Sequence, residues 1–378
     1  MKILSISNCS LVESQGSGYV ILNFCRGLRD HHHEVDLFGP ESYEPLQFLQ
    51  GRATSYRQAV GMLFFTLRQS TKKNYDIVEF YGGESWITAS ILSKITSRKF
   101  LLVSHSNGLE TRYYETLIKS SQTGLIESPF KKWYQLDQTS FFKNAFTQVD
   151  GIVTVSEDEA QYALACQYQD DAHVVGINNS LPEDYIGLSV EFERKPVIGY
   201  CGSWIQRKGI QLIQSDITQI LNEFPECTFK LIGVGANFHK EDYFPTSISA
   251  QIKVIPFVEN KQYLQRIYQS LSILIVPSIY ESFGLVTAEA MACGCAVVVS
   301  KIGWGAALEN HKEALIIENL ISPGLYQAVK ELLLDEPLRI KIAQAGYQRV
   351  QNLRWSTAVD KLQNTYLKWL EEFRQKRR

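Results

Sequence analysis

Two carboxylates in residues 272–305, Glu281 and Glu289, have the side-chain type and the spacing that could do chemistry. Glu281 falls in a predicted turn, and Glu289 falls on the helix that good helix formers predict over residues 284–292. Eight residues of helix rise about 12 Å, so these two carboxylates cannot share one proton as a close catalytic pair would. Their separation suits the two ends of an elongated ligand.

The residues between the two carboxylates lead into the N-terminus of the predicted helix: Ser282, Phe283, Gly284 and Leu285. Backbone N–H groups at such a terminus have no partner within the helix, and they bind phosphate. A carboxylate on either side can accept hydrogen bonds from hydroxyl groups. A nucleotide-sugar has this layout, because ribose, diphosphate and hexose follow one another along the molecule.

Two short apolar runs flank the turn and the helix and must position them. Residues 272–277 and 295–300 are rich in Ile and Val, which predicts two buried strands. A strand–turn–helix–strand unit of this kind is the building block of a parallel sheet whose faces are covered. Short apolar runs also alternate with helical patterns in the first half of the chain, so the predicted fold class is α/β.

The motif PSIYESFGLVTAEAMACGCAVV, residues 277–298, resembles the donor-site signature of the retaining GT-B glycosyltransferases, in the glycosyltransferase group 1 (GT4-like) family. The resemblance implies two Rossmann-like domains that face a central cleft. It also implies a last helix that crosses back to the amino-terminal domain. We therefore expect an acceptor domain over residues 1–185, a nucleotide-sugar donor domain over residues 186–355 and the returning helix over residues 356–378.

The resemblance also implies roles in the carboxy-terminal domain. Glu289 is expected to hold the ribose, and Glu281, with the backbone of residues 282–285, to hold the hexose and the edge of the diphosphate. Lys208 lies six residues after a glycine, as in the family pattern, and is expected to stabilise the leaving diphosphate. Ser203 stands where the family usually has arginine, and Arg207 is the candidate to supply that charge. Val258 is expected to meet the base.

Further candidates lie in the amino-terminal half. Gly16 and Gly18 follow the first predicted strand, where family members close a glycine-rich loop against the donor phosphate. His105 ends another predicted strand, and the family often has a histidine near here that contacts the donor sugar or the reaction centre. Alignment with the family puts Asn107 at that position. Two alternatives stay open besides a packing role: His105 acts as the catalytic histidine, or Asn107 replaces it as a neutral hydrogen-bond partner.

Bulk properties narrow the class of protein. The chain has 378 residues, of which 45% are hydrophobic and 21% charged, so two globular domains are expected. Its net charge is −2, so nucleic acid is not an expected partner. No apolar run approaches the roughly 20 residues of a membrane span. Seven cysteines form no CxxC pair, so reduced thiols and a cytoplasmic protein are expected. The consecutive side chains at residues 31–33 point in different directions, so these histidines are not expected to bind one metal ion. No metal or other cofactor is expected for the reaction, because Lys208 can stabilise the leaving diphosphate and no DxD-type pair follows a predicted strand.

Two segments carry aromatic and basic residues. Residues 112–146 are expected to pack on the amino-terminal sheet, with an acceptor cleft or a membrane-surface patch as the alternative. The basic tail at residues 374–378 is expected to be a solvated end, with contact to an anionic membrane as the alternative. Peripheral contact with the inner face of the membrane therefore stays open, and the sequence does not indicate an oligomeric state.

These observations lead to a functional hypothesis. The chain is expected to be a metal-independent retaining glycosyltransferase that moves a hexose-type sugar from a UDP- or GDP-sugar to a glycan, glycolipid or small-molecule acceptor. Lys208, Glu281 and His105 are the catalytic candidates. The alternatives are a non-catalytic GT-B partner subunit and another GT-B activity, either a nucleotide-sugar epimerase or a phosphorylase.

Overall fold

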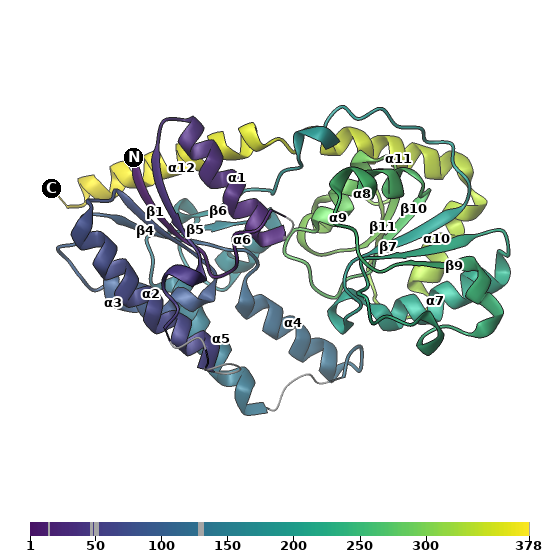
Figure 1. Ribbon diagram of the computed structural model, residues 1–378, viewed down its shortest axis with the longest axis horizontal. Coiled ribbons are helices and arrows are strands. Elements are labelled where there is room, and N and C mark those ends of the chain that lie inside the picture. The colour runs from purple at the N-terminus through teal and green to yellow at the C-terminus, as the bar shows by residue number, and fades with distance from the viewer. Residues whose placement is uncertain (14–15, 46–47, 49–52, 128–131, 378) are drawn as a thin grey trace. The chain divides into compact units, whose positions relative to one another are not determined.

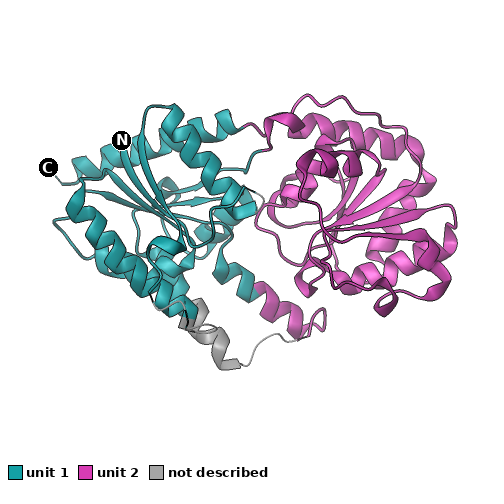
Figure 2. Cartoon of the chain, in the orientation of Figure 1, with its two compact units in different colours: residues 1–115, 129–180, 355–378 teal, residues 116–128, 181–354 magenta. Residues whose placement is uncertain are grey.

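The computed structural model describes residues 1–13, 16–45, 48, 53–127 and 132–377, which form two compact units (Figures 1 and 2). Unit 1 comprises Met1–Glu115, Pro129–Ser180 and Trp355–Arg378, and unit 2 comprises Thr116–Ser128 and Leu181–Arg354. Each unit holds one six-stranded sheet whose paired strands are all parallel. The predicted α/β class is confirmed.

The sheet of unit 1 has the strand order β2-β1-β3-β4-β5-β6. Its strands are β1 (Lys2–Ile6), β2 (Glu34–Phe38), β3 (Ile77–Tyr81), β4 (Leu101–His105), β5 (Gly151–Thr154) and β6 (Val174–Gly176). The helices of this half of the chain are α1 (Gly16–Asp30), α2 (Ala53–Lys72), α3 (Trp86–Leu92), α4 (Glu110–Gln122), α5 (Lys132–Thr147) and α6 (Glu157–Ala165). The last helix of the chain, α12 (Trp355–Gln375), also belongs to unit 1.

Alternate residues of each strand in unit 1 face opposite helical layers, as the pleat of a strand requires. Val78 and Phe80 of β3 pack in one apolar cluster with Met62 of α2 and Phe146 of α5. Glu79 points to the other face, where α1 and α12 lie against each other (Figure 1). The carboxy-terminal helix therefore completes the amino-terminal unit, as the sequence predicted.

Glu79 is a fully buried carboxyl at the centre of this second face. It accepts hydrogen bonds from the hydroxyls of Ser5, of Tyr366 on α12 and, at 3.3 Å, of Tyr81. Burial raises the pKa of Glu79, and these hydroxyl donors oppose that rise. A buried polar group without a hydrogen-bond partner lowers stability. The hydrogen bonds to Glu79 therefore favour one position of α12 on the sheet.

Replacing Tyr366 with phenylalanine removes one of these donors without changing the shape of the ring. We expect the free energy of unfolding to fall by about 1–3 kcal/mol, measured by denaturant unfolding. Tyr263→Phe is the matched control, because Tyr263 is 51% exposed. Equal losses in the two variants would contradict a specific role for the Tyr366–Glu79 contact.

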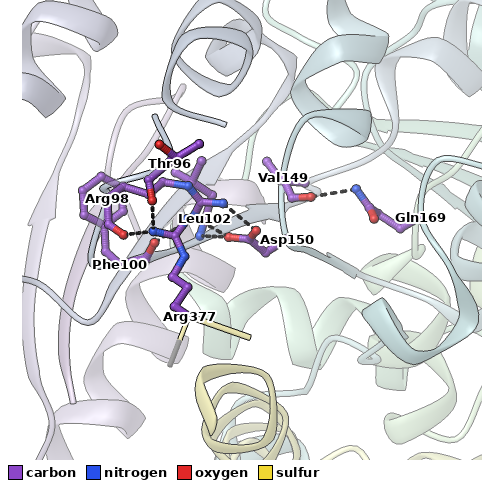
Figure 3. A network of polar contacts seen from close by, with 8 residues as sticks. All are labelled: Thr96, Arg98, Phe100, Leu102, Val149, Asp150, Gln169 and Arg377. Carbon is purple, nitrogen blue, oxygen red and sulfur yellow. Dashed lines mark hydrogen bonds and ion pairs between the residues drawn. The ribbon is translucent and has the colours of Figure 1, made fainter. Parts of the chain in front are cut away.

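The carboxy-terminal tail is exposed over residues 374–377, as expected for a solvated end, and two of its arginines also make polar contacts with the rest of unit 1. Arg377 donates to the backbone carbonyls of Thr96, at 2.8 Å, and of Arg98 (Figure 3). Arg98 in turn makes a two-pronged ion pair with Asp150, with both N···O distances 2.6 Å. Arg374 adds an ion pair with Asp76 at 2.6 Å. The basic side chains of the tail serve this attachment, which the sequence pattern alone did not indicate.

The sheet of unit 2 has the strand order β12-β11-β10-β7-β8-β9. Its strands are β7 (Val197–Cys201), β8 (Thr228–Ile232), β9 (Ile252–Ile255), β10 (Ile273–Val276), β11 (Ala296–Ser300) and β12 (Leu315–Ile317). Its helices are α7 (Ile210–Glu223), α8 (Lys261–Gln269), α9 (Leu285–Ala292), α10 (Gly324–Leu334) and α11 (Glu336–Val350). The predicted strand–turn–helix–strand unit is confirmed as β10, α9 and β11.

Part of the predicted aromatic segment lies outside the described residues. Phe130 and Lys131 belong to that part, and the side chains of residues 132–139 are not described. Further along, Phe142 and Phe146 of α5 are buried, in agreement with packing on the amino-terminal sheet. Among the helices that the structure describes, none is long and apolar enough to cross a membrane.

Candidate functional site

The candidate donor residues gather where the strand order of unit 2 reverses. The chain runs from β7 outward through β8 to β9, and then returns to place β10 on the other side of β7. Ligands of open α/β sheets bind beyond the carboxyl ends of the strands at such a switch point. The segments that follow β7 and β10 contain Lys208 and Glu281, so both candidates stand at this position.

Backbone contacts bring these two segments together. Lys208 ends the short 3-10 helix η5 (Gln206–Lys208) that follows β7. The carbonyl of Arg207 accepts hydrogen bonds from the N–H groups of Ile279, at 2.8 Å, and Tyr280, at 3.4 Å. This pair of contacts ties η5 to the turn after β10 and sets Lys208 beside Glu281.

Lys208 and Glu281 form an ion pair in the structure, with Nζ against Oε1. Their side chains are 14% and 15% exposed, and the Ser278 hydroxyl donates to the same carboxylate oxygen at 3.2 Å. A cation held in this way can move to a diphosphate when one binds, since phosphate oxygens offer the same charge-assisted hydrogen bonds. Arg207 is partly buried nearby, while Ser203, at the family's arginine position, is exposed.

Gly209 allows η5 to pack closely against the turn after β10. Its φ of +73° lies in the left-handed region, and a Cβ there would stand 2.0 Å from the carbonyl oxygen of Pro277. We expect Gly209→Ala to push η5 away from the turn, to destabilise unit 2 by more than about 2 kcal/mol and to weaken nucleotide binding. Thermal unfolding with and without nucleoside diphosphate measures both effects.

Gly187→Ala is the matched control for this substitution. Gly187 has a φ of +70°, but a Cβ there meets no atom within 4 Å. It should therefore cost only the backbone strain of about 1 kcal/mol. If the two variants behaved alike, the close approach of Gly209 to Pro277 would not matter to the site.

Helix α9 begins beside the ion pair. Its N-cap residue, Gly284, has a φ of +99°, and no side chain caps the helix within the described residues. Phe283 is buried and its ring stacks on that of Trp304, with 5.6 Å between centroids. Trp304 is 2% exposed, so it packs behind the turn.

Glu289 lies on the second turn of α9 and has a partner that sequence reasoning missed. Tyr268 on α8 donates its hydroxyl hydrogen bond to Glu289 Oε2, at 3.2 Å, and also lies 3.2 Å from the Cys201 thiol. Burial raises the pKa of Glu289 to about 7. The Tyr268 hydroxyl thus links Glu289 to Cys201, the last residue of β7, the strand that precedes Lys208. No sequence signal marked Tyr268, since it is one apolar position of a helix.

The candidates in unit 1 have different surroundings. A Cβ at Gly18 would stand 2.7 Å from the carbonyl oxygens of Ser10 and Val12, so glycine there allows the first loop to pack on α1. Gly16 begins that helix and is exposed. In unit 2, Val258 is partly buried in the segment between β9 and α8.

His105 and Asn107 carry polar atoms without partners in the described structure. His105 is 1% exposed, with its ring 4.6 Å from that of Tyr81 and 5.0 Å from that of Phe24. Burial lowers the pKa of His105 to about 3, so the imidazole is neutral. Neither ring nitrogen of His105 and neither amide atom of Asn107 finds a hydrogen-bond partner within the described part of the chain.

The described residues contain no group of three or more His, Cys, Asp and Glu side chains that could hold a metal ion. His31 and His33 both contact the last helix. His31 lies 3.5 Å from Asp360, and His33 Nε2 lies 3.1 Å from the Gln363 carbonyl oxygen.

Two family models match the sequence, one in each half. The model described as Glycosyltransferase Family 4 matches residues 14–177, and the model described as Glycosyl transferases group 1 matches residues 195–335. The second of these ranges contains Lys208, Glu281 and Glu289.

Curated relatives are also similar over part of their length. A D-inositol 3-phosphate glycosyltransferase of Corynebacterium aurimucosum is 28% identical over 178 residues, which is 45% of this chain and 42% of that protein. An uncharacterised glycosyltransferase of Methanocaldococcus jannaschii is 26% identical over 235 residues, 60% of this chain and 62% of the relative. The matched region thus spans less than two thirds of each relative's length.

Solved structures share the fold over nearly the whole chain. Sucrose-phosphate synthase of Thermosynechococcus elongatus superposes with a TM-score of 0.78 at 16% identity, covering 98% of this chain and 100% of that one. HepE of Anabaena, solved in complex with UDP-glucose, gives a TM-score of 0.68 at 17% identity, covering 97% and 99%. At such identities the likeness establishes the two-domain GT-B fold.

Proposed function

The chain belongs to the GT-B glycosyltransferases, with a Family 4 domain followed by a group 1 domain, and from this membership we propose that it is a retaining, metal-independent hexosyltransferase. Its donor is a UDP- or GDP-sugar, and its acceptor is a glycan, a glycolipid or a small molecule. The observation that carries the proposal is the Lys208–Glu281 ion pair beside the uncapped start of α9, at the switch point of the unit 2 sheet.

Each donor group has a partner of suitable chemistry in this site. The Glu289 carboxylate accepts hydrogen bonds from the ribose hydroxyls, and Glu281 accepts from the hexose. The diphosphate accepts hydrogen bonds from the N–H groups at the start of α9 and from the ammonium of Lys208. The Anabaena protein of the same fold is solved with UDP and with UDP-glucose, which supports UDP as the nucleotide.

The transfer proceeds on one face of the sugar. The bond between the anomeric carbon and the diphosphate oxygen breaks, and the acceptor oxygen bonds to the same carbon from the same side. The departing phosphate takes the proton of the acceptor hydroxyl, so no protein base is required. Negative charge grows on the diphosphate during this step, and Lys208 stabilises it more in the transition state than in the ground state. The neutral imidazole of His105 suits a hydrogen-bonding role rather than proton transfer.

Peripheral contact with a membrane is part of the proposal, because the outer face of α2 is apolar. Tyr56, Val60, Phe64 and Leu67 recur at helical spacing and are each between 38% and 67% exposed. Arg68 and Lys72 continue the same exposed face. An apolar stripe that ends in basic residues suits the surface of an anionic bilayer.

Thermal stabilisation by nucleotides tests the proposed function. The protein is heated with UDP, GDP, ADP and the corresponding nucleotide-sugars, each with and without a chelator. A rise in melting temperature with one nucleoside diphosphate that survives the chelator supports a metal-independent donor site and names the base. No rise with any of them would contradict the transferase and favour the non-catalytic partner subunit. Stabilisation by inorganic phosphate alone would favour a phosphorylase.

A further inference from the structure

A pocket of about 580 Å³ lies in unit 1 where the end of α12 meets the segment before β4. Its described lining comes from residues 96–99 and from Phe373, Arg374 and Arg377. Residues 96–99 precede the amino end of β4, whereas His105 and Asn107 lie at and beyond its carboxyl end. The pocket therefore lies at the edge of the sheet opposite to the one where open α/β sheets bind their main ligands.

The charge of this lining is positive. Its cationic residues are Arg98, Lys99, Arg374 and Arg377, and none of the described residues in the lining is Asp or Glu. Asp150, just before β5, pairs with Arg98 at 2.6 Å. Asp76, just before β3, pairs with Arg374 at 2.6 Å. Neither Lys99 nor Arg377 has a carboxylate partner among the described residues, so two positive charges of the pocket are left without a counter-ion.

Arg377 is held in place without being neutralised. Its Nη1 donates to the backbone carbonyl oxygens of Thr96, at 2.8 Å, and of Arg98 (Figure 3). Its guanidinium carbon lies 4.4 Å from the centroid of the Phe373 ring, and that of Arg98 lies 5.0 Å from the same centroid. Carbonyls and an aromatic ring orient a guanidinium but leave its unit charge in place. The N–H groups on Nε and Nη2 of Arg377 have no acceptor within the described structure, so they can bind a ligand.

The chemistry of the lining matches a phosphate group. Cations gathered around one pocket repel one another, and an anion bound among them offsets that repulsion. Arginine can donate two parallel hydrogen bonds to phosphate oxygens, and lysine adds a compact charge. Thr96 and Ser97 are exposed in the same lining, where their hydroxyls can donate as well. The volume is within the range of small-molecule pockets, so it accommodates an organic group attached to the phosphate.

We propose that this pocket binds a phosphate monoester at a site separate from the donor site. The organic part of the ester is either a soluble molecule or the glycerol of an anionic phospholipid, since both present the same phosphate group. A bound phosphate joins residues 96–99 to the end of α12. The proposal does not depend on the proposed function, because Lys208 and Glu281 belong to unit 2 and every described residue of the pocket belongs to unit 1.

Calorimetric titration of the full chain with glycerol 3-phosphate tests the site. We expect binding, and we expect Lys99→Gln to weaken it about tenfold, as the loss of one charge-assisted contact predicts. The Lys99 residue is exposed and its side chain has no polar contact with the described residues, so this substitution should leave the fold intact. Adding Arg377→Gln to Lys99→Gln should weaken binding about 100-fold.

Two lysines provide matched controls. Lys94 is an exposed lysine five positions before Lys99 and outside the lining, so Lys94→Gln should bind glycerol 3-phosphate normally. Lys208→Ala should also bind it normally, because this variant alters only the donor site. A loss in Lys94→Gln equal to that in Lys99→Gln would mean binding to a diffuse positive surface, which overturns the proposal. A loss in Lys208→Ala without a loss in Lys99→Gln would place the phosphate in the donor site, which overturns it too.

Sedimentation with vesicles distinguishes the two sources of the phosphate. Phosphatidylcholine vesicles are compared with vesicles that also contain phosphatidic acid, whose headgroup is a phosphate monoester. Binding that requires phosphatidic acid, falls in Lys99→Gln and is displaced by glycerol 3-phosphate supports the site and identifies a lipid headgroup. Titration of glycerol 3-phosphate that depends on Lys99, without such vesicle binding, supports the site and identifies a soluble ester. If neither signal depends on Lys99, the pocket is not a phosphate site.

Discussion

Lys208→Ala is expected to lower kcat/KM for sugar transfer by about 100- to 1000-fold, the usual loss when one stabilising group for a developing oxyanion is removed. Lys208 is the cation that the structure holds against Glu281 at the switch point, and in the proposed reaction it stabilises the leaving diphosphate most in the transition state. The rate is measured as nucleoside diphosphate release at low donor concentration. Thermal unfolding of the variant checks that unit 2 remains folded.

A lysine elsewhere in unit 2 provides the control. Lys312 has a side chain that is 58% exposed and pairs with Glu309 at the surface, so Lys312→Ala should leave the rate unchanged. A structural role for Lys208 is distinguished by the double variant Lys208→Ala with Glu281→Gln. If Lys208 only kept Glu281 in place, the double variant would be no slower than Glu281→Gln alone. We expect the double variant to be much slower, because no lysine then stabilises the negative charge on the leaving diphosphate.

Glu289→Ala is expected to weaken binding of the stabilising nucleoside diphosphate by about 10- to 100-fold, in line with the loss of hydrogen bonds to a charged group. The structure places this carboxylate beside Tyr268, whose hydroxyl also contacts Cys201 at the end of β7. Calorimetric titration or the shift in melting temperature measures the loss. Glu318→Ala, at a carboxylate that is 71% exposed in the same unit, should bind normally. Unchanged binding in Glu289→Ala would remove Glu289 from the ribose site.

Burial raises the pKa of Glu289 to about 7. This pKa should make nucleotide affinity and folding stability depend on pH in opposite directions. Nucleotide affinity should fall below pH 7, by up to about tenfold per pH unit, because the ionised carboxylate accepts the ribose hydrogen bonds. The folding stability of the ligand-free protein should change with pH in the opposite direction. A folded pKa above the unfolded value of about 4.5 means that this stability contribution is present below pH 4.5 and is lost as pH rises through 7. Glu289→Gln should remove both dependences.

The sequence alone determined most of the secondary structure of unit 2 and the identity of the family. The apolar runs that predicted buried strands at residues 272–277 and 295–300 became β10 and β11. Local patterns succeed here because a strand buried on both faces is a continuous apolar run, and a glycine ends the helix between them. The motif from Pro277 to Val298 combined these local requirements with two glutamates, and the matching family model covers the same residues.

Only the tertiary structure decided which side chains meet. Lys208 contacts Glu281 from 73 positions away, Tyr366 reaches Glu79 across 287, and Asn8 meets Glu84 across 76. No local periodicity encodes such pairs, because they depend on strand order and on how closely glycines let segments approach. Burial also sets the protonation of these groups, and burial is a property of the folded chain. The sequence therefore specified the chemical groups, while the order of strands in the two sheets decided where they act.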